Sequence, residues 1–143
     1  MFVYLVINRG GVPLFLFPNI KEFQGVKINS VLFSGLIAAI NTFSMETTGD
    51  IVGEATFGNL LTTMSLDSNN NIHVFITKKD VPIELHKQLH IEFKSLFLSI
   101  LKKHEIELTP EKILDGGKEL EEKLRPELEP VYRLWTKTYA QYN

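Results

Sequence analysis

Two histidines four residues apart come closest to a catalytic or metal-binding motif in this sequence. His86 and His90, in the run HKQLH, would share one face of a helix and could form half of a metal site. The run is not HExxH, and the chain has no cysteine. Both histidines border an apolar stripe, where an amphipathic ring can pack with its tip in water. We therefore expect neither a metal nor a cofactor.

The other residue types that could do chemistry lack the context that chemistry requires. Gly10–Gly11 and Gly116–Gly117 are not in a GxxxxGK[ST] or GxGxxG frame, so we interpret them as turns rather than phosphate loops. Ser30, Ser34 and Ser44 are not in the GxSxG frame of a nucleophile elbow. We expect a protein without enzymatic activity.

The most informative segment carries no charge at all. Between Lys27 and Glu46 the chain runs INSVLFSGLIAAINTFSM. On a helix, its bulky side chains form one stripe that we expect to pack on a sheet: Leu32, Phe33, Leu36, Ile37, Ala39, Ile40 and Phe43. The opposite face should be solvated, yet it carries small and uncharged residues: Val31, Gly35, Ala38 and Thr42 in a line, flanked by Ser34, Asn41 and Met45. A seam of small residues lets another backbone approach closely, so we expect a second subunit to cover it.

Composition narrows the classes of partner. The chain of 143 residues is 44% apolar, enough for one domain with a core. A formal charge of −2 with interspersed signs gives no basic surface for nucleic acid or anionic membrane. The uncharged segment approaches the length of a membrane span, but its serines, asparagines and threonine make it too polar for lipid. With no cysteine and no glycosylation sequon, we expect a cytoplasmic protein.

The elements that must position this segment form an antiparallel pattern. Strands are predicted at 2–8 and 12–17 around the Arg9-Gly10-Gly11 turn, and at 50–57, 60–67 and 72–77 as a meander after the uncharged helix. Pro13 and Pro18 favour an edge position for the second strand, because proline cannot donate to a ladder. We predict an α+β fold with sheet order 2-1-5-4-3 and Gly53 on the other edge.

Two helical regions follow the strands. Asp80-Val81-Pro82 should open a helix, with Asp80 as its cap and Leu85, Leu89, Phe93, Leu96, Phe97 and Ile100 on its apolar stripe. We place a domain at 1–106 and an amphipathic helical extension at 107–143, broken at Gly116–Gly117. An aromatic cluster of Tyr132, Trp135 and Tyr139 in the extension fits either a core or a partner groove.

Two stretches of the sequence resemble a known superfamily. FVYLVINRGGVPLFLF resembles the opening hairpin of longin domains. SGLIAAINTFSMETTGDIVGEATFGN is similar to the junction between helix and third strand in small longin and roadblock proteins associated with Ras-like GTPases. The resemblance covers residues 1–104, and the segment from Thr109 onward departs from it. It implies a longin-like, profilin-like five-stranded antiparallel sheet sandwiched by helices, in the order β-β-α-β-β-β-α.

The resemblance also implies a function and an interface. Its members are non-enzymatic modules that dimerise, join adaptor or vesicle-trafficking complexes and present a surface to a small GTPase. Carried over by position, the interface residues are Val31, Ser34, Gly35, Ala38, Asn41 and Thr42 on the helix and Ile51, Val52 and Gly53 on the strand. The expected partners are a second copy or another longin or roadblock protein, and a Ras-like GTPase.

Two alternatives to a plain scaffold are open at this stage. An arginine finger would require a protruding arginine, and Arg9 at the hairpin tip is the one with that geometry. Arginines at turn tips are more often solvated surface, so we expect an adaptor rather than an activating protein. The alternative function is a small-ligand sensor, which requires a cavity of about 300 Å³ or more with convergent polar groups.

Overall fold

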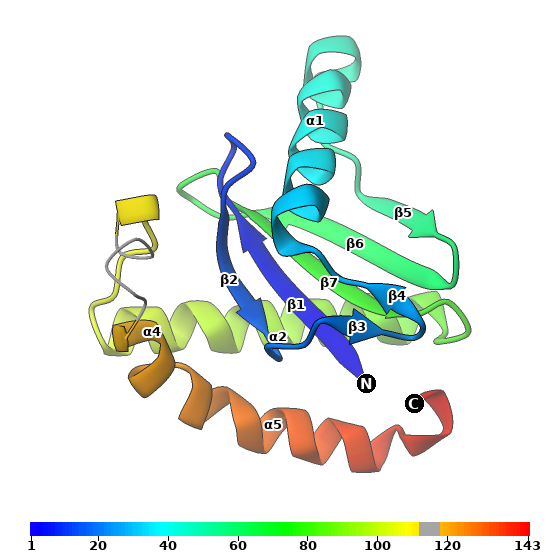
Figure 1. Cartoon of the computed structure of the whole chain (residues 1–143), viewed down its shortest axis with the longest axis vertical. Helices are drawn as coiled ribbons and strands as arrows, with labels where there is room; N and C mark the ends of the chain where they lie inside the picture. Colours follow the sequence, from blue (N-terminus) through cyan, green and yellow to red (C-terminus); the bar gives the residue numbers. More distant parts are fainter. Residues whose placement is uncertain (112–117) are drawn as a thin grey trace. The chain divides into compact units, whose positions relative to one another are not determined.

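The chain folds around a five-stranded antiparallel sheet in the computed structural model, which describes residues 1–111 and 118–143 (Figure 1). The strands are β1 (Phe2–Ile7), β2 (Pro13–Phe17), β5 (Glu54–Phe57), β6 (Leu60–Leu66) and β7 (Ile72–Lys78). Their order is β2-β1-β7-β6-β5. The α+β class and the strand order predicted from the sequence are therefore confirmed.

The centre of the sheet is its most apolar part. β1 is the run FVYLVI, and all six of its residues are buried. It pairs with β7 from Phe2↔Thr77 to Ile7↔Ile72 and with β2 on its other side. A strand paired on both sides has no free edge, and it buries side chains on both of its faces.

Proline and glycine mark the two edges of the sheet. Pro13 begins β2 at one edge, as predicted, and Pro18 follows that strand directly. β5 forms the other edge, but it begins at Glu54, four residues later than predicted. Gly53 lies just before it and its carbonyl accepts a hydrogen bond from the Met64 amide at 3.0 Å. A short hairpin, β3 (Glu22–Phe23) with β4 (Val26–Lys27), precedes the first helix.

The uncharged segment forms α1, Ser30–Thr48. The Asn29 side chain caps its start by accepting a hydrogen bond from the Leu32 amide at 3.1 Å. Gly49 ends it with a φ of 80°, a left-handed conformation in which glycine has no steric penalty. α1 packs on one face of the sheet through Ile37, which joins a core with Val3, Leu5, Val74 and others, and its later turns extend past the strands (Figure 1).

The described residues form two compact units, Phe2–Lys79 and Met1 with Asp80–Asn143. The first contains the sheet, the short hairpin and α1. The second contains α2 (Ile83–Lys103), α4 (Lys118–Lys123), α5 (Arg125–Thr138) and the short helix η1 (Ala140–Tyr142). The predicted boundary between residues 106 and 107 stays a prediction, and the predicted break at Gly116–Gly117 lies outside the described residues.

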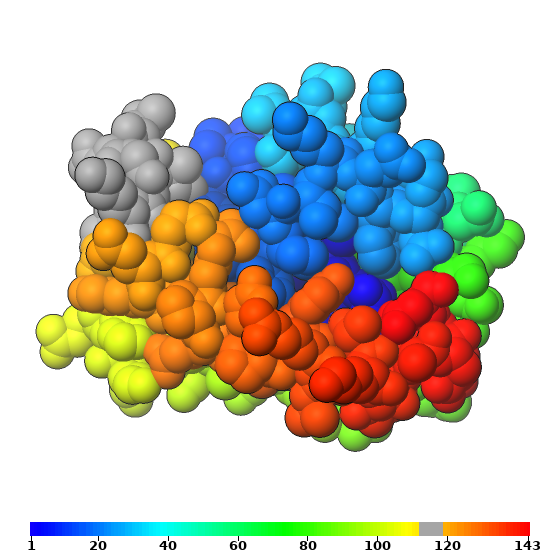
Figure 2. All heavy atoms as spheres, turned by 60° about the horizontal axis from the view of Figure 1, so that its bottom comes forward, coloured from blue at the N-terminus to red at the C-terminus, as the bar shows by residue number. Residues whose placement is uncertain are grey.

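Within the second unit, α5 runs alongside α2 (Figures 1 and 2). The rings of Phe93 and Trp135 lie 6.0 Å apart. At the end of α2, Lys103 and His104 contact the Glu127 carboxylate at 2.7 and 2.6 Å. These contacts lower the pKa of Glu127, through the Lys103 hydrogen bond first and the His104 bond second. The aromatic side of the extension thus packs on its own unit.

The start of α2 differs from the prediction. Its N-cap residue is Pro82 rather than Asp80, and the N-cap residue makes no side-chain capping hydrogen bond. Proline fixes its backbone near the helical φ and has no N–H to satisfy, which suits a helix start. Neither α2 nor any other helix in residues 1–111 and 118–143 is long and apolar enough to cross a membrane.

Candidate functional site

α1 is rotated about its axis relative to the prediction. Its buried residues are Ser34, Ile37, Ala38 and Asn41, so only part of the face expected to meet a partner packs within the unit, together with Ile37 of the face expected to pack on the sheet. The bulky side chains at the opposite face are in solvent: Leu32 is 72% exposed, Leu36 46% and Phe43 69%, and Ala39 is exposed between them. We call Leu32, Leu36, Ala39 and Phe43 the apolar stripe.

The small residues of α1 do receive a second backbone, but it belongs to the same chain. The β1–β2 hairpin tip approaches the helix so closely that a Cβ at Gly11 would lie 3.3 Å from the Ala38 Cβ and 3.5 Å from the Gly35 Cα. Gly11 also has a φ of 85°, which favours glycine. Part of the small-residue seam therefore accommodates a backbone of the same chain, and a second subunit at the remaining part stays a prediction.

Asn41 has a role inside the domain. It is 3% exposed, its amide nitrogen donates to the Ile37 carbonyl at 2.8 Å, and its side-chain oxygen accepts from the Val52 amide at 2.8 Å. It thereby fastens the segment between α1 and β5 to the helix. Ser44 acts in the same way, because its hydroxyl donates to the Asp50 carbonyl at 2.7 Å. A buried polar side chain in this position is stabilised by such hydrogen bonds.

The predicted interface residues therefore fall into three groups. Ser34, Ala38 and Asn41 are buried within the unit. Ile51 and Val52 are half-buried beside α1. Val31, Gly35, Thr42 and Gly53 are exposed. The interface itself stays a prediction, and α1 offers it the apolar stripe together with Val31, Gly35 and Thr42.

The apolar stripe continues into a recess that opens toward the β5 side of α1. The recess has a volume of about 420 Å³ and is lined by Ala39, Ile40, Phe43, Ser44, Thr47, Thr48 and Val52. On the same side, the Phe33 and Phe57 rings meet edge to face at 5.7 Å, which fixes α1 against β5. An apolar stripe, a recess and a strand edge thus form one continuous surface.

The hydroxyl groups that line the recess already donate hydrogen bonds to backbone carbonyls. The Thr47 hydroxyl donates to the Phe43 carbonyl at 2.8 Å, the Thr48 hydroxyl donates to the Ser44 carbonyl at 2.8 Å, and Ser44 donates to Asp50. Small-molecule sites need convergent polar groups that fix the orientation of the ligand. The recess offers apolar contact instead, which suits a side chain from another protein.

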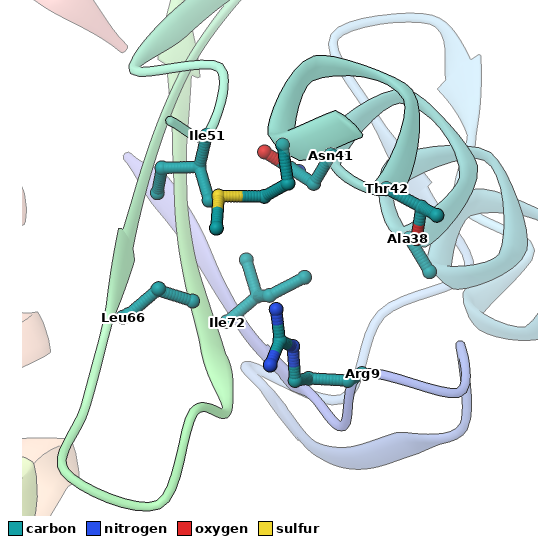
Figure 3. Close-up of a pocket in the computed structure, with 8 residues that line it drawn as sticks. Arg9, Ala38, Asn41, Thr42, Ile51, Leu66 and Ile72 are labelled. Atoms are coloured by element: carbon teal, nitrogen blue, oxygen red, sulfur yellow. The ribbon is translucent and has the colours of Figure 1, made fainter. Parts of the chain in front are cut away.

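A second hollow lies on the other flank of α1 (Figure 3). It has room for about 20 Å³, roughly one water molecule, and is lined by Arg9, Ala38, Asn41, Thr42, Met45, Ile51, Leu66 and Ile72. Figure 3 shows the Arg9 guanidinium reaching from the hairpin into this space beside Ile72. Arg9 is exposed, as predicted, but its side chain is directed along the protein rather than away from it.

Tyr4, His73 and Asp67 form a buried chain of hydrogen bonds within the sheet unit. The Tyr4 hydroxyl contacts His73 Nδ1, and His73 Nε2 lies 2.8 Å from Asp67 Oδ2. Because a carboxylate only accepts, Nε2 carries a proton, and in the neutral imidazole the Tyr4 hydroxyl then donates to Nδ1. Burial, together with the charge of Asp67, raises the Tyr4 pKa well above 10. Tyr4 and His73 are 0% exposed, so the arrangement cannot meet a substrate and acts as a structural network.

Asp67 is the charged end of that network. Burial raises the pKa of its carboxyl, but hydrogen bonds from His73, Asn71 and Asn69 outweigh this, so the pKa lies below its usual value. The backbone amides of Asn69 and Asn71 donate to it at 2.8 and 3.0 Å. The network therefore ties the β6–β7 turn to the centre of the sheet.

The histidine pair of α2 differs from its prediction. His86 is 0% and His90 6% exposed, so neither ring has the solvated tip that the sequence suggested. Within residues 1–111 and 118–143, no three His, Cys, Asp or Glu side chains are grouped so that they could hold a metal ion.

Solved structures with a similar arrangement come from bacteria. Myxococcus xanthus MglB is 14% identical over 63% of this chain and 73% of its own, with a TM-score of 0.44. The gliding protein MglB from Thermus thermophilus is 13% identical over 62% and 70%, with a TM-score of 0.47. A Roadblock/LC7 domain from Streptomyces avermitilis is 8% identical over 65% and 82%, with a TM-score of 0.45. No protein-family model and no curated protein matches the chain.

These likenesses concern the fold alone. The order of elements along the chain, with α1 between the opening hairpin and the meander, is the one that the sequence resemblance implied, and the sheet order is the one predicted from the prolines and the meander. The sequence analysis predicted an interface on α1 and the following strand, which stays a prediction, and it misjudged the rotation of the helix. The signal that could have corrected it is Asn41, a polar residue in line with the small residues.

Proposed function

We propose that this chain is a non-enzymatic interaction module that pairs, through α1 and the β5 edge, with a second domain of the same fold. The observation that carries the proposal is the apolar stripe, which leaves Leu32, Leu36 and Phe43 exposed beside a strand with an unpaired edge. Large exposed apolar side chains and open strand edges are features that proteins normally cover.

The spacing of the stripe favours another helix as its cover. Leu32, Leu36, Ala39 and Phe43 follow one another at intervals of four, three and four residues, the pattern of a helix–helix seam. No charge occurs between Lys27 and Glu46, so the covering surface must itself be uncharged. A second copy of this chain supplies such a surface. A two-fold axis would then bring α1 against α1 and β5 against β5.

The sensor alternative has less support. The recess is large enough for a small ligand, but the hydroxyls of Ser44, Thr47 and Thr48 are occupied by backbone carbonyls. The hollow beside Arg9 is too small to enclose one. Both features fit contact with a protein better than capture of a metabolite.

The resemblance of the sequence adds a Ras-like small GTPase as the class of protein that the pair would bind. We propose an adaptor or platform rather than an activating protein, because Arg9 is directed into the hollow beside α1 instead of projecting from the hairpin (Figure 3). An arginine finger must reach the transferring phosphoryl group of the nucleotide.

Hydrogen exchange tests the proposed pairing at the strand edge. Amides of β5 that point outward from the sheet should exchange slowly at about 100 μM protein and faster at about 1 μM, since dilution separates the pair. β2, the other edge strand, is the internal control and should exchange at the same rate at both concentrations. Equal exchange of β5 at the two concentrations would contradict self-pairing through this edge.

A further inference from the structure

Arg9 differs from the other two arginines in having no carboxylate partner among residues 1–111 and 118–143. Arg125, at the start of α5, pairs with Glu121 of α4, and Arg133 pairs with Glu129 within α5, each partner lying four residues earlier in the sequence. Within the described part of the chain, no hydrogen bond or ion pair reaches the Arg9 guanidinium. Its five donors are therefore available to a ligand.

The hairpin holds Arg9 in place. The Asn8 side chain accepts from the Val12 amide at 2.9 Å, and the Asn8 amide donates to the Val12 carbonyl at 3.0 Å. Gly11 rests against Ala38 and Gly35 of α1, so the tip cannot move toward the helix without a clash. A donor on a braced turn loses little conformational freedom on binding.

The walls of the hollow would strengthen an ionic contact. Met45, Ile51, Leu66 and Ile72 surround the space with apolar surface, while Thr42 and Asn41 line it from α1. Charge-assisted hydrogen bonds are stronger beside apolar surface, where the effective dielectric constant is lower than in water. The hollow therefore places the Arg9 guanidinium beside apolar surface, an environment that favours binding of an anion.

We propose that this hollow receives a carboxylate from a bound protein, carried by an acidic side chain and held by Arg9. The size of the space decides the class of ligand. Room for about one water molecule accepts the end of a side chain but cannot enclose a free metabolite, which requires hundreds of cubic ångströms. The planar guanidinium matches the two oxygens of a carboxylate.

This inference deepens the proposed interaction function by naming the chemistry of one contact, and it involves a different side of α1. The apolar stripe and the recess contain Ala39 and Phe43, whereas the hollow contains Ala38 and Thr42. A carboxylate contact here can therefore be measured whether or not the chain pairs with itself.

The test is an NMR titration of the full chain, labelled at arginine Nε and at Ile, Leu and Met methyl groups. Sodium acetate is the probe, sodium chloride maintains the ionic strength, and methyl phosphate is the competing anion. We expect saturable shifts at Arg9, Ile72 and Met45, with half-saturation at roughly 10–100 mM, the range of one charge-assisted contact. Arg9→Gln should abolish them, and Arg133→Gln, at another exposed arginine, should not.

Three outcomes would overturn the proposal: no saturable shift with acetate, equal shifts in Arg9→Gln, or saturation by methyl phosphate but not by acetate. Thermal unfolding of each variant guards against a folding defect, and none is expected, because Arg9 is exposed and makes no bond within the described chain. The variant Arg9→Lys is a second test. It keeps the positive charge but lacks the planar guanidinium, so acetate should bind to it several-fold more weakly than to the wild type.

Discussion

At the scale of single residues, polar groups inside the sheet unit have mainly structural roles. Asn41 satisfies two backbone groups, and Asp67 accepts bonds from His73 and from two backbone amides. Histidine next to aspartate and tyrosine would suggest catalysis if the group were open to solvent. Burial of Tyr4 and His73 gives the arrangement a different role, since an enclosed network fastens strands and turns together.

Acid should weaken the fold through Asp67. Its pKa in the folded chain lies below the ordinary value, so its contribution to stability is present above the unfolded-state pKa and is lost as pH falls through the folded-state value. Urea unfolding from pH 7 down to about pH 3 should show a falling free energy of unfolding. Asp67→Asn should be less stable at pH 7 and lose less on acidification. An equally steep loss in the variant would show that other carboxyls dominate.

At the scale of elements, the prediction from the sequence and the structure differ in the rotation of α1 about its axis. Strand order followed from turn residues and alternating apolar runs, and it was predicted correctly. The helix has no charged side to mark its solvent face, so bulky apolar residues were assigned to the core by default. The structure instead places small residues against the hairpin at Gly11, because only they allow that approach. The rotation of α1 is determined by contact with the hairpin, a segment distant in sequence, and no local sequence pattern indicates that contact.

The Asn41 contact should determine how firmly the segment before β5 is held. In Asn41→Ala the Val52 amide loses its acceptor, and an unsatisfied buried group costs about 1–3 kcal/mol. Chemical denaturation should show a loss of that size, and the Val52 amide should exchange faster. Thr42→Ala, at the exposed neighbouring position, should change neither. A stability loss without faster exchange at Val52 would locate the defect elsewhere.

At the scale of the whole molecule, we propose that the apolar stripe and the β5 edge form the surface on which another domain binds. The sequence predicted this location, from the missing charges of α1 and from resemblance, but not the side chains that carry it. Pairing is the central claim, because the adaptor function depends on it. It predicts that a single charge on the stripe separates the pair without unfolding the chain.

Sedimentation velocity of the wild type, Phe43→Glu and Ile91→Glu tests that claim most directly. Phe43 and Ile91 are both 69% exposed, but only Phe43 belongs to the stripe, so Ile91→Glu is a matched control for an added charge. At tens of micromolar, we predict a dimer for the wild type and for Ile91→Glu, and a folded monomer for Phe43→Glu. A monomeric wild type, or a Phe43→Glu variant that remains dimeric, would contradict the account.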